Sequence, residues 1–151
     1  MSVNKTVIIK ETDGDYIDSV LKISEAVFGR TNERFILSNS FFRHGILAAS
    51  FDERGCMTGY AAANIIADEC ELLSIGVLPE YRRNKAGAGL LNHLFTAAAE
   101  KGAVVIYLEV RKSNVAALAL YGAAGFTGYA ERKNYYSDPA DDAVLMRKEL
   151  S

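Results

Sequence analysis

The chain has 151 residues, of which 50% are hydrophobic and 24% are charged, and its formal net charge is −2. This length suits one domain with a core of its own, and we expect residues 1–151 to form a single domain. The small negative charge argues against a protein that coats nucleic acid or an anionic membrane surface. No apolar run reaches the roughly 18 residues of a membrane span. Residues 1–10 lack the layout of a signal peptide, so we expect a cytoplasmic protein.

The ligands of a zinc site are scarce in this sequence. The chain has two cysteines, Cys56 and Cys70, and two histidines, and neither cysteine belongs to a CxxC pair. Zinc sites combine closely spaced cysteine and histidine side chains. We therefore expect no metal and two reduced thiols.

The predicted elements follow one another in a mixed order. Alternation and short apolar runs predict strands, and apolar residues at helical spacing predict helices. In chain order we expect a strand at 7–10, helices at 15–28 and 31–39, strands at 46–51, 57–66 and 71–78, a helix at 86–101, a strand at 104–110, a helix at 115–124, and strands at 126–133 and 143–149. This order predicts an α/β fold, with a mixed sheet of six or seven strands flanked by about four helices.

The turn at residues 82–87 is the first sign of a ligand. It runs Arg-Arg-Asn-Lys-Ala-Gly between a strand and a helix, and it gathers Arg82, Arg83 and Lys85. The open N–H groups and the dipole of a helix start attract phosphate, and Gly87 allows close approach to the backbone. We expect a pyrophosphate here, and the alternative is an ordinary basic surface turn. The turn is neither a GxGxxG motif nor a P-loop, so a Rossmann or ATPase fold is not supported.

Several motifs in order resemble the GCN5-related N-acetyltransferase (GNAT) superfamily. Residues 82–87 occupy the frame of its Arg/Gln-x-x-Gly-x-Gly/Ala motif, with Lys85 where the family usually has its first glycine. A closer resemblance, to the ribosomal-protein-alanine N-acetyltransferase branch, lies in residues 108–114 (Leu-Glu-Val-Arg-Lys-Ser-Asn), 119–121 (Ala-Leu-Tyr), 125–126 (Gly-Phe) and 132–136 (Arg-Lys-Asn-Tyr-Tyr). The resemblance spans about residues 72–136, whereas the preceding chain matches only in its pattern of elements.

The resemblance implies a role for each matching residue. Backbone groups of residues 75–77 would bind the acetyl and pantetheine portion of acetyl-coenzyme A (acetyl-CoA), and the turn would bind its pyrophosphate. Glu109 would act as the general base and Tyr121 as the general acid, while Tyr135 and Tyr136 would contact the acceptor. The residues expected at acetyl-CoA are Ile75, Gly76, Val77, Arg82, Arg83, Asn84, Lys85, Ala86, Gly87, Ala88 and Asn114.

Two features depart from the family pattern. If the position of Lys85 needs a left-handed backbone, lysine costs about 1–2 kcal/mol there, which its ammonium offsets by pairing with a phosphate. The chain also has no tryptophan, and residues 28–31 stand where the protein-alanine branch often carries Pro-Trp. The second departure concerns the acceptor more than the chemistry.

Each catalytic candidate also has a structural interpretation. Burial at the end of an apolar strand would raise the pKa of Glu109, whereas the alternative is a glutamate that faces water or pairs with Arg111. Tyr121 either protonates the departing thiolate or packs in the core against Phe126.

The last predicted hairpin carries further candidates. Tyr135 and Tyr136 either wall the acceptor cleft or cover the core. Asp138, Asp141 and Asp142 either attract a cationic acceptor or form a solvated loop.

We expect the strands around Ile75 and Tyr107 to diverge and form a V-shaped opening. A bulge near Gly76 would expose a backbone N–H as the oxyanion donor. Neither cysteine lies in the motif region, so we expect direct transfer in a ternary complex.

Three functions stay open. The first is N-terminal acetylation of a protein, with a ribosomal protein that begins with alanine as the specific case. The second is acetylation of a small amine, such as a polyamine or an amino sugar, and the third is a non-catalytic sensor of coenzyme A. The match at residues 134–136 favours the first. We expect a monomer or a homodimer, with no nucleic acid or membrane as partner.

Overall fold

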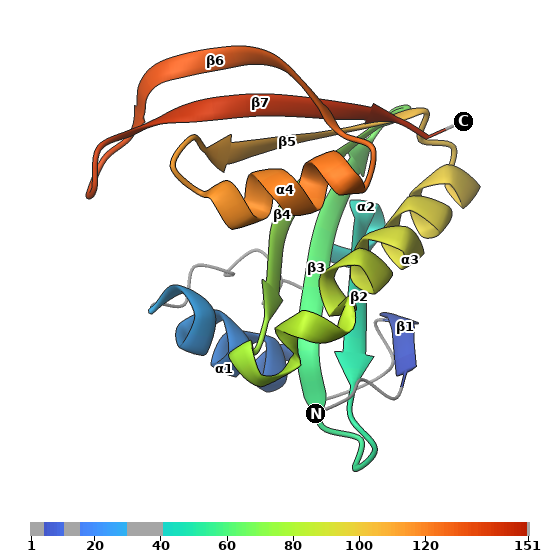
Figure 1. Ribbon diagram of the computed structural model, residues 1–151. Coiled ribbons are helices and arrows are strands. Elements are labelled where there is room, and N and C mark those ends of the chain that lie inside the picture. The colour runs from blue at the N-terminus through green and yellow to red at the C-terminus, as the bar shows by residue number, and fades with distance from the viewer. Residues whose placement is uncertain (1–4, 11–15, 30–40, 151) are drawn as a thin grey trace.

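A mixed sheet of seven strands forms the centre of the computed structural model, which describes residues 5–10, 16–29 and 41–150 (Figure 1). The strands are β1 (Lys5–Ile9), β2 (Gly45–Phe51), β3 (Met57–Ile66), β4 (Glu69–Val77), β5 (Val105–Arg111), β6 (Thr127–Tyr136) and β7 (Asp141–Glu149). Their spatial order is β1-β2-β3-β4-β5-β7-β6, and only the β4–β5 pair is parallel. The predicted α/β class with a mixed sheet is confirmed.

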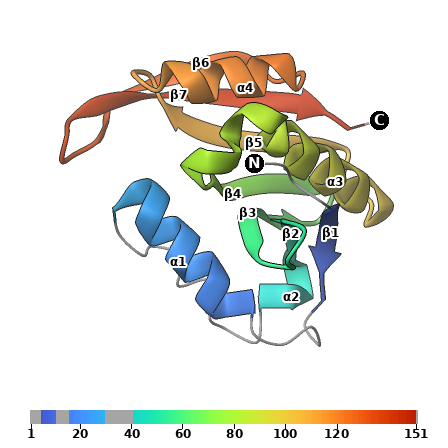
Figure 2. The same ribbon diagram turned by 60° about the horizontal axis from the view of Figure 1, so that its bottom comes forward.

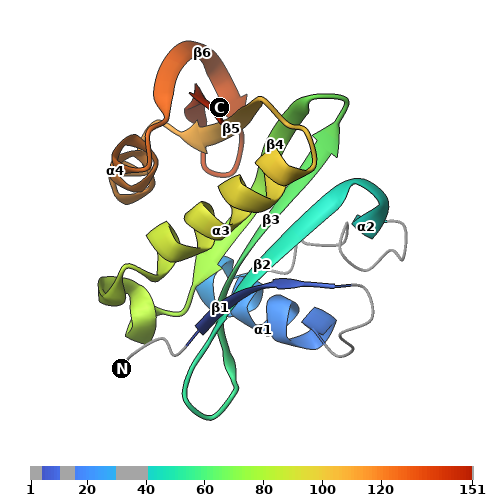
Figure 3. The ribbon, with the colours of Figure 1, turned by 90° about the vertical axis from the view of Figure 1, so that its right-hand side faces the viewer.

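Helices cover both faces of this sheet. They are α1 (Tyr16–Phe28), α2 (Phe41–His44), α3 (Ala86–Glu100) and α4 (Val115–Ala123), and a 3₁₀ helix, Pro79–Asn84, precedes α3. Figure 2 shows α1 and α2 on one side of the sheet and α3 on the other, and in Figure 3 α3 crosses β2 and β3. The short helix predicted at residues 31–39 lies outside the described residues, and α2 follows that region.

Two hydrophobic cores form because the inner strands are buried on both faces. Along β2, Leu47 and Ala49 face the core under α1, whereas Ile46 and Ala48 face the core under α3. Such two-sided burial explains why β2 and β3 read as nearly continuous apolar runs. Helix α3 closes the second core through its buried residues Leu90, Leu91, Leu94, Ala97 and Ala98, and Phe95 packs against this core partly buried.

The sheet opens between β4 and β5. Their pairing consists of three registered residues and ends at Glu71 opposite Tyr107. Beyond this point β4 continues beside β3, while β5 continues beside β7, so the two strands diverge. In Figure 1 β5, β7 and β6 run across the top of the molecule at a steep angle to β2, β3 and β4. The V-shaped opening expected near Ile75 and Tyr107 is therefore present.

The predicted bulge lies in β4, but not near Gly76. Ala62 pairs with Ser74 and Ala63 pairs with Leu72, so Leu73 is the extra residue. Gly76 pairs regularly with Tyr60, and a Cβ at this glycine would lie 3.1 Å from the Tyr60 ring. Gly76 therefore leaves room for the Tyr60 ring, and it has no part in the bulge.

Candidate active site

The start of α3 is open to an anion. Lys85 precedes the helix with φ 58° and ψ 26°, so the left-handed backbone considered for this position is present. No side chain caps the helix, and Gly89 N–H is bonded to the carbonyl of Lys85. The N–H groups of the preceding first turn have no helical acceptor, and they combine with the helix dipole into a site that favours phosphate.

The basic turn is anchored to the sheet. The Arg82 Nε donates to the carbonyl oxygen of Val77 at 3.0 Å, which folds this side chain back toward the end of β4. Tyr81 is buried, and its hydroxyl donates to Asp52 in the β2–β3 turn at 3.2 Å. The side chains of Arg83 and Asn84 lie outside the described part of the structure, so their roles stay predictions.

Residues 75–77 lie along the open side of β4. One edge of this segment pairs with β3, and the other edge has passed the last pair with β5. Because successive backbone groups of a strand point to opposite edges, alternate N–H and C=O groups here face the opening. This exposed edge suits the backbone contacts expected with an extended pantetheine chain.

Helix α4 stands beside the start of α3. Asn114 caps α4, since its Oδ1 accepts the N–H of Ala117 at 3.1 Å. A Cβ on Gly87 would lie 3.3 Å from Leu120, so this glycine lets the two helices approach. Tyr121 of α4 lies in the same core cluster as Ala86 and Leu90 of α3.

Glu109 is exposed, and the predicted burial of its carboxylate is wrong. Alternation along β5 buries Leu108 and Val110 and turns Glu109 to the face that carries α1 elsewhere in the sheet. No described helix contacts this part of that face closely enough to bury the carboxylate. Arg111 donates to the carbonyl of Pro139 at 2.8 Å and lies over the Tyr136 ring.

Tyr121 is buried, and its ring contacts Phe126 at a centroid distance of 5.8 Å. Tyr121 therefore packs in the core against Phe126, as the structural alternative proposed. Burial raises the pKa of Tyr121 to about 12, and the charge of Tyr136 adds to the increase. The phenol thus keeps its proton near neutral pH and remains a hydrogen-bond donor.

Tyr135 and Tyr136 face Glu109 from the end of β6. A hydrogen bond with Glu109, followed by the charge of that carboxylate, raises the pKa of Tyr135. Burial, followed by the charge of Glu109, raises the pKa of Tyr136. Tyr136 thus lies within electrostatic range of both Glu109 and Tyr121.

A cavity of about 420 Å³ adjoins this group. Its lining comes from β3 to β7 and combines apolar, acidic and aromatic side chains: Asn64, Ile66, Glu69, Cys70, Glu71, Tyr107, Leu108, Glu109, Tyr129, Arg132 and Leu145. Arg132 also stacks over Tyr135 at 5.6 Å. Neither Glu71 nor Arg132 was assigned a role from the sequence. Alternation along β4 was a signal for Glu71, whereas β6, exposed up to Tyr135, offered none for Arg132.

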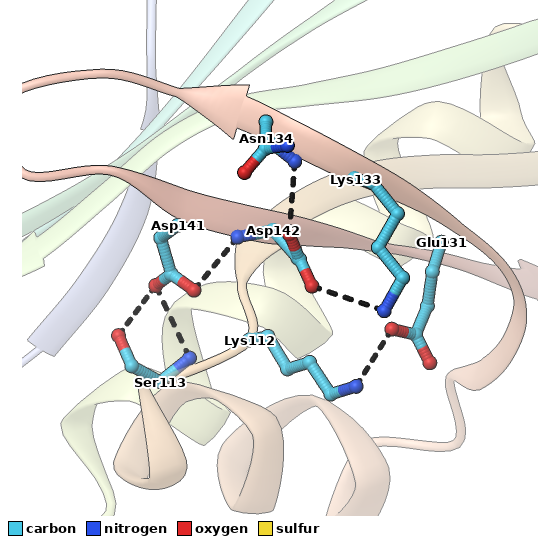
Figure 4. A network of polar contacts seen from close by, with 7 residues as sticks. All are labelled: Lys112, Ser113, Glu131, Lys133, Asn134, Asp141 and Asp142. Atoms are coloured by element: carbon cyan, nitrogen blue, oxygen red, sulfur yellow. Dashed lines mark hydrogen bonds and ion pairs between the residues drawn. The ribbon is translucent and has the colours of Figure 1, made fainter.

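The acidic residues of the last hairpin make internal contacts (Figure 4). Asp141 accepts the Ser113 hydroxyl at 2.5 Å, and Asp142 accepts the Asn134 N–H at 2.8 Å and pairs with Lys133. The Ser113 hydroxyl bond contributes most to lowering the pKa of Asp141, and the Asn134 N–H contributes most for Asp142. These two carboxylates therefore organise the hairpin, and the alternative that they attract a cationic acceptor stays a prediction.

The two cysteines differ in exposure, and the described residues offer no metal site. Cys56 is exposed beside the β2–β3 turn, whereas Cys70 is buried and burial raises its thiol pKa to about 12. Within the described residues, no group of three or more His, Cys, Asp or Glu side chains could hold a metal ion. No described helix is long and apolar enough to cross a membrane.

Known proteins are similar to this chain in sequence and in fold. Residues 17–126 match the acetyltransferase (GNAT) family. Over 122 residues, 80% of this chain and 81% of the relative, the chain is 36% identical to the ribosomal protein bS18-alanine N-acetyltransferase of Escherichia coli strain K12. Over 99 residues, 63% of this chain and 61% of the relative, it is 40% identical to the N-alpha-acetyltransferase RimI of Mycobacterium tuberculosis.

A solved structure extends the comparison to the whole fold. The crystal structure of the ribosomal-protein-S18-alanine N-acetyltransferase from E. coli matches with a TM-score of 0.79 at 29% identity, over 97% of this chain and 95% of that chain. The chain described here belongs to the GNAT family of N-acetyltransferases.

Proposed function

We propose that this chain transfers the acetyl group of acetyl-CoA to the N-terminal α-amine of a protein, with a ribosomal protein that begins with alanine as the specific acceptor. The observation that carries the proposal is a grouping beside the opening between β4 and β5. Glu109 and Arg132 line one cavity, Arg132 lies over the Tyr135 ring, and the Tyr135 ring meets that of Tyr136. Two relatives named above for N-terminal acetylation support the choice of acceptor.

Acetyl-CoA fits the donor side of this opening. Its pyrophosphate would meet the uncapped start of α3 and the basic turn, and its pantetheine would follow residues 75–77. The amide of Asn114 beside α4 would contact the same arm. The bulge at Leu73 leaves a backbone N–H near the thioester as the candidate oxyanion donor.

Glu109 accepts the proton of the acceptor amine, directly or through water. An α-amine has a reference pKa of about 8, so a substantial fraction is already neutral near that pH and an exposed carboxylate is a sufficient base. The neutral amine attacks the thioester carbonyl, and the C–S bond breaks as the amide forms. The second proton lost by the amine nitrogen passes through water to the coenzyme A thiolate.

Tyr121 stabilises the departing sulfur. Its phenol has a pKa of about 12, whereas a free thiol has a reference value of about 8.5. Complete proton transfer to the thiolate is therefore unfavourable, and a donated hydrogen bond during C–S cleavage is the contribution that this pKa supports.

Release of coenzyme A in the presence of an acceptor panel tests the proposal. The panel contains peptides that begin with Ala, Ser or Met, an internal-lysine peptide, spermidine and an aminoglycoside. We expect turnover of the Ala or Ser peptide, a loss of about 100-fold or more in kcat for Glu109→Gln, and little change for the exposed control Glu100→Gln. Equal activity of Glu109→Gln and the wild type would contradict the assigned base.

Acetylation of a small polycationic amine is a second candidate function. The observation that favours it is the cavity lining, which includes three carboxylates, Glu69, Glu71 and Glu109, and one guanidinium, Arg132. Turnover of spermidine or the aminoglycoside, with no turnover of any peptide in the panel, would select this function. Binding of acetyl-CoA without any turnover would select the sensor of coenzyme A.

A further inference from the structure

The end of the β6–β7 hairpin lacks a regular strand ladder. Arg132 pairs with Ala143, and the next registered pair is Tyr136 with Asp141, so residues 133–135 stand opposite a single residue of β7. Such an irregularity interrupts the backbone hydrogen bonds of the ladder. This end of the hairpin therefore depends on other contacts for a fixed position.

Two side-chain contacts tie this end to the β5–α4 turn. Arg111 donates from Nη1 to the carbonyl of Pro139 at 2.8 Å, and its guanidinium lies 4.4 Å from the Tyr136 ring centroid. Asp141 accepts the Ser113 hydroxyl at 2.5 Å and the Ser113 N–H at 3.3 Å, as Figure 4 shows. These contacts hold the tip side of the irregular segment, while Asp142 bonds within it to Lys133 and Asn134.

The same contacts determine where the two tyrosines lie. The Tyr135 and Tyr136 rings meet edge to face, with centroids 5.1 Å apart and planes at 86°. The Tyr135 ring also stacks on Arg132, which lines the same cavity as Glu109, and the Glu109 carboxylate raises the pKa of Tyr135. Glu109 shares a face of β5 with Arg111 because the two residues are two positions apart. A shift of Tyr136 away from Arg111 would therefore move Tyr135 away from Glu109.

We propose that Arg111 and Asp141 are positioning residues that hold Tyr135 and Tyr136 over Glu109 and thereby set the affinity for the acceptor. This inference rests on the function proposed above. Arg111 must be arginine, because a planar guanidinium can stack on a ring and donate to a carbonyl at once, whereas an ammonium is a point charge.

Kinetics of Arg111→Met, Arg111→Lys and Asp141→Asn in the full chain test this role. Lys112→Met is the matched control, because the Lys112–Glu131 ion pair of 2.8 Å also joins the turn to the hairpin, but at Glu131 instead of the tyrosine end. With the fastest acceptor of the panel, we expect both Arg111 variants to raise the acceptor KM about tenfold. We expect Asp141→Asn to act in the same direction, and the control to change nothing.

A comparison of the KM values for the two substrates distinguishes a positioning role from a general loss of structure. The KM for acetyl-CoA and the kcat at saturating acceptor should change by less than about twofold in the Arg111 variants. An unchanged acceptor KM in Arg111→Met, wild-type behaviour of Arg111→Lys, or an equal rise in the Lys112→Met control would overturn the proposal.

Amide hydrogen exchange tests the same contacts without an acceptor. Residues 133–141 should exchange about tenfold faster in Arg111→Met and Asp141→Asn, and at the wild-type rate in Lys112→Met. Unchanged exchange in both variants would overturn the proposal even in an active enzyme. Faster exchange in a chain that acetylates no amine would instead contradict the proposed function.

Discussion

Lys85 holds a left-handed backbone at the residue before α3. This conformation costs lysine about 1–2 kcal/mol relative to glycine. A glycine also increases the conformational entropy of the unfolded chain, which offsets part of the stability gained by relieving this strain. We expect Lys85→Gly to raise the free energy of unfolding by about 0.5–1 kcal/mol. Lys85→Ala keeps the strain and should leave the free energy nearly unchanged, and urea unfolding measures both.

The same two variants separate backbone strain from charge. Each removes the ammonium beside the open N–H groups of α3, so each should weaken the binding of acetyl-CoA by up to about tenfold in calorimetry. Tighter binding by Lys85→Gly than by the wild type would contradict a role for the charge.

Tyr121 is a donor whose proton is retained by burial. Tyr121→Phe keeps the ring against Phe126 and removes the hydroxyl, so we expect kcat to fall about 100-fold while acetyl-CoA binding stays unchanged. Steady-state kinetics and calorimetry measure the two quantities. An unchanged kcat would leave Tyr121 as a core residue only.

The raised pKa of Tyr121 also predicts a stability difference at high pH. Because the folded-state pKa is about 12 and the reference value is 10.0, the folded chain holds this proton more tightly than the unfolded chain. That contribution is fully present below pH 10 and is lost as the pH rises through 12. Over this range Tyr121→Phe should lose less stability than the wild type, by on the order of 2 kcal/mol. The exposed Tyr129→Phe serves as the control.

At the scale of elements, one carboxylate joins the β2–β3 turn to the 3₁₀ helix before α3. Asp52 accepts the N–H groups of Arg54 at 2.9 Å and Cys56 at 3.0 Å, as well as the Tyr81 hydroxyl. The Cys56 N–H contributes most to lowering the pKa of Asp52. The turn that faces the expected pyrophosphate is thus held by a hairpin distant in sequence.

We expect Asp52→Asn to destabilise the fold at neutral pH and to converge with the wild type in acid. The folded-state pKa of Asp52 is lowered from 3.8, so its contribution is present above this value and is lost as the pH falls through the folded-state pKa. Urea unfolding at about pH 7 and about pH 3 measures the difference, with the exposed Glu53→Gln as control. A difference that stays constant between the two conditions would contradict this account.

The elements whose signals are local could be predicted from the sequence. The apolar residues of α3 and the apolar runs of β2 and β3 predict which faces of these elements are buried. Strand β3 begins and ends at the predicted residues. Strand β6 extends to Tyr136, beyond the predicted end at residue 133, because its residues up to Tyr135 are exposed and show no apolar alternation. The sequence also missed α2, which has only four residues.

The environment of the site could be predicted only in part. The left-handed Lys85 and the cap at Asn114 follow from local motifs. The exposure of Glu109 depends on which face of β5 other elements cover, and the bulge at Leu73 depends on the register between β3 and β4. Both are tertiary properties that a strand pattern does not contain.

At the scale of the whole molecule, the parting of β4 and β5 divides the sheet into two parts, and we propose that each part serves one substrate. In this proposal the start of α3, α4 and the free edge of β4 form the donor side, and β5 and the β6–β7 hairpin form the acceptor side. We infer that the amine and the thioester meet where these two sides join, next to Glu109.

Fragmentation mass spectrometry of one peptide tests this central inference most directly. The peptide begins with alanine, contains one internal lysine, and is incubated with the chain and acetyl-CoA, so both amines compete in a single reaction. Our account predicts one acetyl group on the α-amine of alanine and none on the lysine. Acetyl on the lysine alone, or an unmodified peptide from a preparation that acetylates spermidine, would contradict it.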